Sequence, residues 1–211
     1  MRTRAILLCT FVGLAIASMG SAPALAAPRC TIRGTPGDDV INGTDGDDVI
    51  CAGAGDDVVF AGKGDDIIRA GKGNDVVHGN RGNDRIFGSR GRDTLFGDDG
   101  NDLIRGQRGG DLLRGYLGED RILGGSGKDR IFGGPGLDVL RGGSGNDDIK
   151  GGLGNDNIKG GSGADMLIGW GGDDTINGVD GVEGNDTLKG SPGTDTCVAD
   201  PNDVILRCEL P

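Results

Sequence analysis

Aspartate recurs at every ninth residue along most of this chain, always two positions after a glycine. Written in nines from Thr35, the sequence reads TPGDDVING, TDGDDVICA, GAGDDVVFA and GKGDDIIRA, with Gly third and Asp fifth. Carboxylates and main-chain carbonyls are the oxygen ligands that Ca²⁺ prefers, and glycine-rich turns expose carbonyls. The spacing therefore predicts stacked carboxylates that would repel one another unless calcium lies between them.

The nine-residue register extends over most of the chain. Sixteen uninterrupted repeats cover 35–178, residues 179–181 form an insertion, and two further repeats cover 182–199. The seventh position is Ile, Val or Leu in every repeat except the last, which has Cys197, and the ninth is always Gly or Ala. Such a period indicates a solenoid. The flanking segments 28–34 and 200–211 are expected to be an N-terminal and a C-terminal cap.

Short strands must position these aspartates. Positions six to eight are expected to form a strand in which only position seven points inward, because strand side chains alternate. Glycines at positions one and three permit tight turns with positive φ. Two repeats then make one coil. The sequence predicts an all-β parallel β-roll of about 18 repeats, with inner ladders such as Ile41, Val59, Val77 and Ile50, Ile68, Ile86.

The composition is unlike that of an ordinary globular enzyme. Glycine supplies 46 of 211 residues and aromatic residues only 3%, so apolar burial alone cannot offset the backbone entropy lost on folding. The net charge of −11 favours cations as partners and disfavours nucleic acid. No HExxH, GxSxG or phosphate-loop motif occurs, and we expect no enzymatic activity. An ice-binding roll would need a regular outward rank of Thr or Asn, which position six lacks.

The first residues are typical of a signal peptide. Arg2 and Arg4 precede an apolar run, and Ala24-Leu25-Ala26 offers a small-residue cleavage site. The run is too short for a transmembrane helix. We expect residues 1–27 to be removed and the protein to be secreted to the extracellular space. The mature chain then has 20 basic and 33 acidic residues, a net charge of −13.

Units such as GSGNDDIKG and GLGNDNIKG resemble the RTX (hemolysin-type) calcium-binding nonapeptide repeat. The resemblance covers about 35–199, without the effector domain that often precedes such arrays. It implies a β-roll in which multiple Ca²⁺ ions lie between stacked turns, held by main-chain carbonyls and aspartates. The implied ligands are Asp39, Asp48, Asp57, Asp66, Asp75, Asp84, Asp93, Asp102, Asp111, Asp120, Asp129, Asp138, Asp147, Asp156, Asp165, Asp174, Asp186 and Asp195. Four repeats have a larger first residue, namely Gln107, Tyr116, Trp170 and Val182. Calcium binding at those turns and beside 179–181 stays open.

Four cysteines remain after removal of the signal peptide, and they allow three disulfide pairings. Partners need Cα atoms within about 7 Å. If the rod forms, its ends are too far apart to pair with each other, which leaves Cys30–Cys51 and Cys197–Cys208. Each would fasten one terminal repeat; unpaired thiols are the alternative.

Outward positions carry two stripes. One is basic and consists of Arg69, Arg85, Arg105, Arg121, Arg141 and Lys159; the other is apolar and consists of Val40, Val58, Phe60, Val76, Phe96, Leu112 and Phe132. Long side chains can simply shield a sheet. The basic stripe could also bind an anionic polysaccharide, and the apolar stripe could support lateral self-association. The sequence thus favours a secreted protein that folds with calcium and has a structural or binding role. The alternatives are an adhesion or matrix module for anionic glycans and, less favoured, an accessory module of a secreted enzyme or toxin system.

Overall fold

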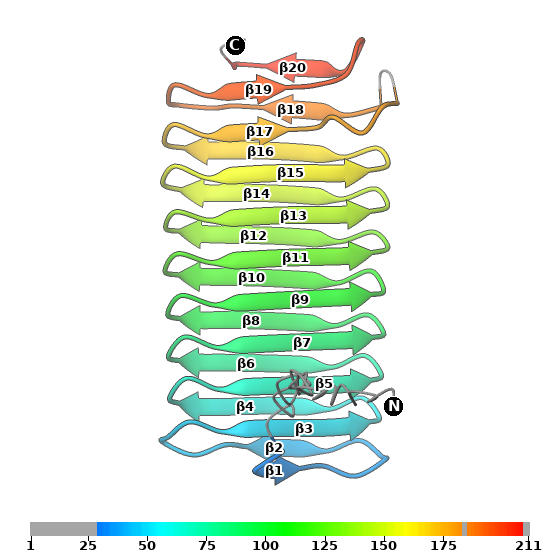
Figure 1. Cartoon of the computed structure of the whole chain (residues 1–211), viewed down its shortest axis with the longest axis vertical. Coiled ribbons are helices and arrows are strands. Elements are labelled where there is room, and N and C mark those ends of the chain that lie inside the picture. Colours follow the sequence, from blue (N-terminus) through cyan, green and yellow to red (C-terminus); the bar gives the residue numbers. More distant parts are fainter. Residues whose placement is uncertain (1–28, 183–184, 209–211) are drawn as a thin grey trace, which may run out of the picture.

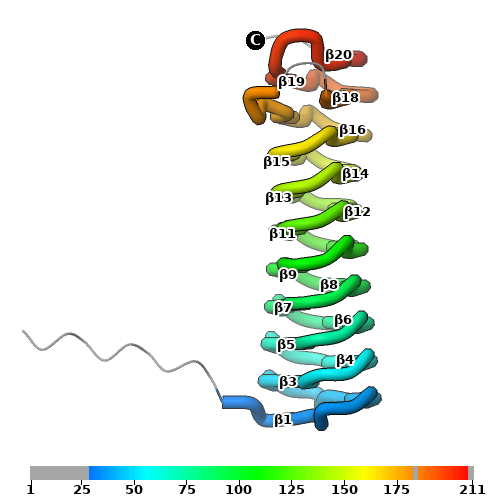
Figure 2. Tube along the Cα trace, turned by 90° about the vertical axis from the view of Figure 1, so that its right-hand side faces the viewer, coloured from blue at the N-terminus to red at the C-terminus, as the bar shows by residue number. Residues whose placement is uncertain are grey.

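The computed structural model describes residues 29–182 and 185–208. These residues form twenty β-strands and no helix. The strands make two parallel sheets of ten strands each, stacked as two layers along a straight rod (Figures 1 and 2). Within this part of the chain, no helix could cross a membrane. The predicted signal peptide, 1–27, lies outside the described residues.

Successive strands alternate between the sheets, so each strand pairs with the strand two places away in the sequence. Sheet A contains β1 (Ile32–Arg33), β3 (Val49–Ala54), β5 (Ile67–Lys72), β7 (Arg85–Arg90), β9 (Leu103–Arg108), β11 (Arg121–Ser126), β13 (Val139–Ser144), β15 (Asn157–Ser162), β17 (Thr175–Asn177) and β19 (Thr196–Val198). Sheet B contains β2 (Val40–Asn42), β4 (Val58–Lys63), β6 (Val76–Arg81), β8 (Thr94–Asp99), β10 (Leu112–Leu117), β12 (Arg130–Pro135), β14 (Asp148–Leu153), β16 (Met166–Gly171), β18 (Thr187–Lys189) and β20 (Val204–Leu206).

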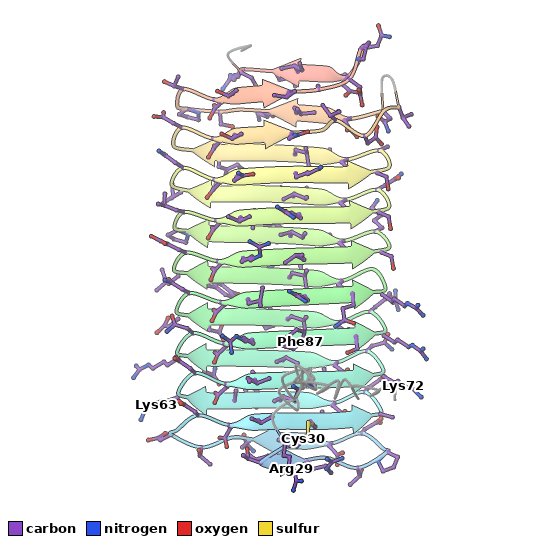
Figure 3. The ribbon with its side chains drawn as sticks, in the orientation of Figure 1. Arg29, Cys30, Lys63, Lys72 and Phe87 are labelled. Carbon is purple, nitrogen blue, oxygen red and sulfur yellow. A yellow bond between two sulfur atoms is a disulfide. The ribbon has the colours of Figure 1, made fainter. Side chains whose placement is uncertain are left out.

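Equivalent positions of the repeats stack directly on one another. Ile50 pairs with Ile68 in sheet A, and Val59 pairs with Val77 in sheet B, each partner being 18 residues away. One coil therefore contains two nonapeptides, and the predicted parallel β-roll is confirmed. Position-two residues lie at the turns between strands. The side chains of Lys63 and Lys72, for example, project from opposite edges of the rod (Figure 3).

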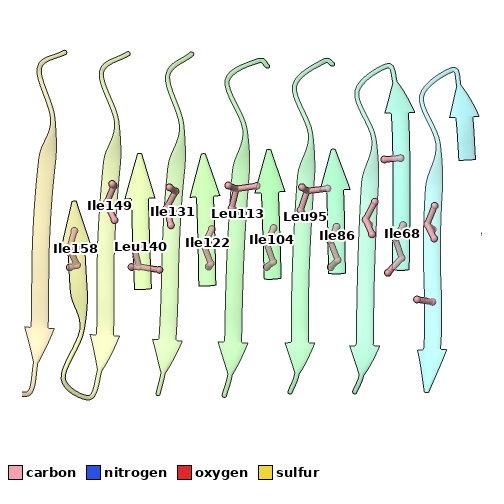
Figure 4. Packing of buried hydrophobic residues seen from close by; sticks show 14 of the residues in the cluster. Ile68, Ile86, Leu95, Ile104, Leu113, Ile122, Ile131, Leu140, Ile149 and Ile158 are labelled. Carbon is pink, nitrogen blue, oxygen red and sulfur yellow. The ribbon is translucent and has the colours of Figure 1, made fainter. Parts of the chain in front are cut away.

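The core consists of two ladders of aliphatic side chains, one from each sheet, which pack against each other along the roll. From Ile50 to Leu188 the position-seven residues have no exposed surface, and Figure 4 shows their side chains following one another along the roll. Position nine is buried as well, as at Ala52, Ala61 and Ala70. Among positions six to eight only position seven points inward, as expected, but most strands are six residues long and continue into the next repeat. Alternation then brings position nine inside.

Incomplete repeats close both ends of the roll. Ile32 pairs with Ile50, and Ile205 pairs with Leu188, so both extend the position-seven columns. The two predicted disulfides are present: Cys30–Cys51 has a Cα–Cα distance of 5.8 Å and Cys197–Cys208 one of 5.7 Å. Each joins a terminal segment to the adjacent coil, where a solenoid lacks a neighbour on one side.

The insertion at 179–181 does not interrupt the sheets, because Thr175 still pairs with Thr196 across it. Asp180 fixes the inserted loop to the neighbouring turns. Its carboxylate accepts hydrogen bonds from the main-chain N–H groups of Gly163 and Val182, at 3.1 and 2.8 Å. Its own N–H donates to Asp200 over 2.9 Å. The insertion is therefore an outward loop on a continuous roll.

Candidate calcium-binding turns

The position-five aspartates stand at the entrance to each strand, in two columns at the edges of the roll. From Asp57 onward their exposed fraction is 2% or less. These carboxylates are therefore buried inside the turns and do not line the solvent-exposed edge of the roll. One oxygen, Oδ1, accepts a hydrogen bond from the main-chain N–H of the equivalent aspartate in the preceding coil. The N–H of Asp66 donates to Asp84 over 2.8 Å, and that of Asp75 donates to Asp93 over 3.0 Å. The carboxylates thus link coil to coil.

The other oxygen, Oδ2, is buried and has no hydrogen-bond partner among the described residues. This holds for sixteen of the predicted aspartates, which are Asp57, Asp66, Asp75, Asp84, Asp93, Asp102, Asp111, Asp120, Asp129, Asp138, Asp147, Asp156, Asp165, Asp174, Asp186 and Asp195. A buried carboxylate oxygen without a partner costs considerable free energy. A column of such atoms is the donor set that a hard cation would satisfy.

The electrostatics of the columns agree with this reading. The pKa of Asp102 is raised to about 7, mainly by burial and also by the carboxylate of Asp120, although a main-chain hydrogen bond linking Asp102 to Asp84 opposes both. Burial likewise raises the pKa of Asp84 and Asp120 to about 7. Without a counter-ion, the fold therefore penalises the ionised form of these groups. A divalent cation between the coils would remove that penalty.

Main-chain carbonyls face the same spaces as the partnerless oxygens. A Cβ built on Gly79 would collide with Oδ2 of Asp84 and would meet the carbonyl oxygen of Gly97 at 2.7 Å. These two oxygens therefore face the same small space beside the Cα atom of Gly79, which stays empty because glycine has no side chain. Over 29–182 and 185–208, no three Asp, Glu, His or Cys side chains converge to hold a metal. A calcium site here would consequently need carbonyl oxygens in addition to aspartates.

The first two aspartates differ from the other sixteen. Oδ2 of Asp39 accepts hydrogen bonds from the N–H and hydroxyl of Thr35, at 2.6 and 3.0 Å. Oδ2 of Asp48 accepts the same pair from Thr44, at 2.8 and 2.9 Å. Burial tends to raise the pKa of Asp48, but the hydrogen bonds from Thr44 and Thr31 hold it below its ordinary value. Internal donors thus occupy the positions that calcium would take elsewhere.

Sequence reasoning missed two features of the columns. Thr occupies position one only in the first two repeats, and that change could have indicated an internally satisfied turn. At the other end, Asp203 extends a column beyond the last full repeat. Its Oδ1 accepts N–H bonds from Asn185 and Asp186, and its Oδ2 accepts one from Asp200 at 2.8 Å. Pro201 stands two residues before Asp203, where every repeat has glycine, so the repeat pattern does not include Asp203.

Three of the four repeats with a larger first residue keep the same turn. Gln107, Tyr116 and Trp170 adopt φ values of 79°, 76° and 86°. The aspartates of these repeats are Asp111, Asp120 and Asp174, and each has the same buried, partnerless oxygen as its neighbours.

The basic stripe lies on six consecutive strands of sheet A, from β5 to β15. Across four of these strands, bases alternate with apolar residues in both columns. Position eight reads Arg69, Phe87, Arg105, Leu123, and position six reads Ile67, Arg85, Leu103, Arg121. The guanidinium of Arg105 lies 5.8 Å from the ring centroid of Phe87, so the basic groups pack over their apolar neighbours.

The predicted apolar stripe lies on sheet B. His78 stacks between Phe60 and Phe96, with ring centroids 5.2 and 4.5 Å away. Its Nδ1 is 3.1 Å from a carboxylate oxygen of Asp98. Val40 is the most open member, with 72% of its surface exposed.

Comparison with known proteins gives one family and no individual relative. The model for the RTX calcium-binding nonapeptide repeat matches in nine overlapping segments, which begin at residue 31 and end at residue 203. No curated protein matches this sequence. The family match covers the whole run of stacked turns that carries the aspartate columns. The chain therefore belongs to the RTX calcium-binding nonapeptide repeat family.

Proposed function

We propose that this protein is a secreted β-roll that folds when calcium binds and has a structural or binding role outside the cell. The observation that carries the proposal is the set of sixteen buried aspartates that each keep one oxygen without a partner. Two disulfides support an oxidising compartment. We expect the role to be non-catalytic, because the sequence has none of the catalytic motifs HExxH, GxSxG or the phosphate loop.

The sixteen aspartates from Asp57 to Asp195 would hold the ions, together with glycine carbonyls such as that of Gly97. When bound, calcium would supply positive charge that neutralises carboxylates between adjacent coils. The aspartates themselves join the coils through their Oδ1 atoms. Asp39 and Asp48 were also expected as ligands, but their hydrogen bonds from Thr35 and Thr44 favour a capping role. The proposal fixes no number of bound ions; native mass spectrometry of the calcium-loaded protein would count them.

Circular dichroism of the mature chain tests the proposal directly. In chelator the chain has a charge of −13 and a thin core, so it should be largely disordered. Calcium in the millimolar range typical of extracellular sites, about 10⁻⁴–10⁻³ M, should produce β signal. Magnesium at the same concentration is the control for charge screening. Equal β signal in chelator and in calcium would refute the proposal.

A second candidate function is calcium-dependent adhesion to an anionic glycan through the basic stripe on sheet A. The alternation of bases and apolar residues from β5 to β11 favours it, because it spaces the bases evenly over a flat surface. Replacing Arg69, Arg105 and Arg141 by Gln should weaken binding to acidic polysaccharide at low salt. Unchanged binding by the folded variant would exclude this stripe.

A further inference from the structure

Two aromatic residues occupy a backbone conformation that suits glycine. Tyr116 and Trp170 hold the first position of their repeats with φ of 76° and 86°, where a bulky side chain is strained. Eight of the eighteen repeats have glycine at this position. Despite the strain, both rings face solvent, with 41% and 55% of their surface exposed. Strain combined with exposure indicates a contribution outside the core, since neither ring is needed to fill it.

The register places both rings on the outer face of sheet B, three coils apart. Gly134 and Gly152 hold the same repeat position in the two coils between them. With no side chains there, two adjoining hollows remain, of about 210 and 230 Å³. Tyr116 lines the first, Trp170 lines the second, and Phe132 lines both. We call this surface, from Tyr116 through Phe132 to Trp170, the aromatic groove.

Cationic groups surround the central ring of the aromatic groove. The guanidinium of Arg114 and the ammonium of Lys150 each lie 5.2 Å from the centroid of Phe132, and the guanidinium of Arg130 lies 5.7 Å away. Arg114 also donates to the hydroxyl of Tyr116 over 3.4 Å. The carboxylate of Asp148, 3.7 Å from the ammonium of Lys150, offsets one of the three charges. The groove therefore keeps an excess of positive charge.

We propose that the aromatic groove binds an extended chain of carboxylated sugars. The apolar face of a sugar ring packs on an aromatic ring by dispersion, and ring carboxylates pair with Arg114 and Lys150. Three coils at about 4.8 Å each give a length of about 14 Å, which suits several linked rings rather than one small molecule. The hollows are open and lie end to end, as a linear chain requires. This inference deepens the anionic-glycan candidate but places the site on sheet B, opposite the basic stripe.

Glycine substitutions give the sharpest test, because the turn itself favours glycine at these positions. Titration calorimetry with a short oligogalacturonate in saturating calcium should show affinity for the mature protein. Tyr116→Gly and Trp170→Gly should each lower that affinity at least about tenfold, as expected for aromatic contact residues. Gln107→Gly is the matched control: it relieves the same backbone conformation, with φ of 79°, but lies on sheet A. It should bind as the wild type does.

Circular dichroism of each variant in calcium separates loss of binding from loss of folding, and so separates this inference from the proposed calcium-driven folding. Arg114→Gln with Lys150→Gln provides a second test that leaves the turns untouched, and it should also reduce binding about tenfold or more. Wild-type affinity in the two glycine variants and in the double-glutamine variant would overturn the proposal. Equal affinity for a methyl-esterified oligomer would overturn the recognition of carboxylates. A dimer that Trp170→Gly dissociates in sedimentation would assign the groove to a second copy instead.

Discussion

The main-chain N–H of Asp84 donates to Oδ1 of Asp102 over 2.7 Å, while Oδ2 of Asp102 is buried without a hydrogen-bond partner among the described residues. The same carboxylate thus joins two coils and presents an oxygen that the protein does not satisfy. Because the contact exists only after the coils have stacked, cation binding at this oxygen and folding are coupled.

Asp102→Asn should raise the calcium concentration needed for folding several-fold, because it removes one charged ligand from the middle of a column. Asp48→Asn is the matched control: the same substitution in the same column, at a residue whose Oδ2 already accepts two hydrogen bonds from Thr44. Its calcium midpoint should stay close to that of the wild type. Titrations followed by circular dichroism give both midpoints. Equal shifts in the two variants would show that Asp48 is also a ligand.

The repeat pattern was sufficient to predict the roll, since one period fixes both the turn and the ladder register. It could not predict how far each strand extends. The strands continue past position eight into the next repeat, and the alternation of side chains then buries position nine. Nor could it separate Asp39 and Asp48 from the other aspartates, since their difference depends on the hydroxyls of Thr35 and Thr44. The juxtaposition of Tyr116 and Trp170 with Phe132 was not predicted because the pattern assigns position one to the turns, whereas Tyr116 and Trp170 lie within strands β10 and β16.

The calcium-free roll should be more stable in acid than at neutral pH. Burial raises the pKa of Asp84, Asp102 and Asp120 from 3.8 to about 7 in the fold, so the folded roll binds protons that the unfolded chain releases. The stability from protonation is complete below about pH 4 and is lost as the pH rises through about 7. In chelator, lowering the pH from about 7.5 to about 4 should increase the β signal in circular dichroism.

The same pKa shifts predict competition between protons and calcium. As the pH falls through about 7, protonation should raise the calcium midpoint, because only the ionised carboxylate is a good ligand. A β signal in chelator that does not change with pH would contradict the account of buried, partnerless aspartates. A calcium midpoint that does not change with pH would contradict their role as ligands.

Trp170 should report folding of the C-terminal repeats. It is the only tryptophan of the sequence, and it lines a hollow together with Leu153 and Pro192. These three residues come from three different repeats. Its fluorescence should therefore change when calcium assembles these coils. Asp195→Asn should move the fluorescence midpoint to higher calcium, and Asp66→Asn, near the other end, is the comparison. Equal midpoint shifts would indicate one cooperative unit. A flat signal during the rise in β signal would contradict ordering of this region by calcium.

Calcium should also reverse the net charge of the protein. Without the proposed signal peptide, 1–27, the chain carries −13, and each ion adds two positive charges, so between six and seven ions neutralise it. Sixteen partnerless aspartates in two columns provide enough carboxylates for more ions than that. The loaded protein should then migrate as a cation and attract acidic polysaccharide, an attraction that weakens with salt because charges are screened within about 8 Å at physiological ionic strength.

Native mass spectrometry would count the ions, and electrophoretic mobility at each calcium concentration would give the sign of the charge. Magnesium at equal ionic strength controls for screening. If the calcium-saturated protein still migrates as an anion, the charge reversal is wrong, and calcium acts on this protein through folding alone.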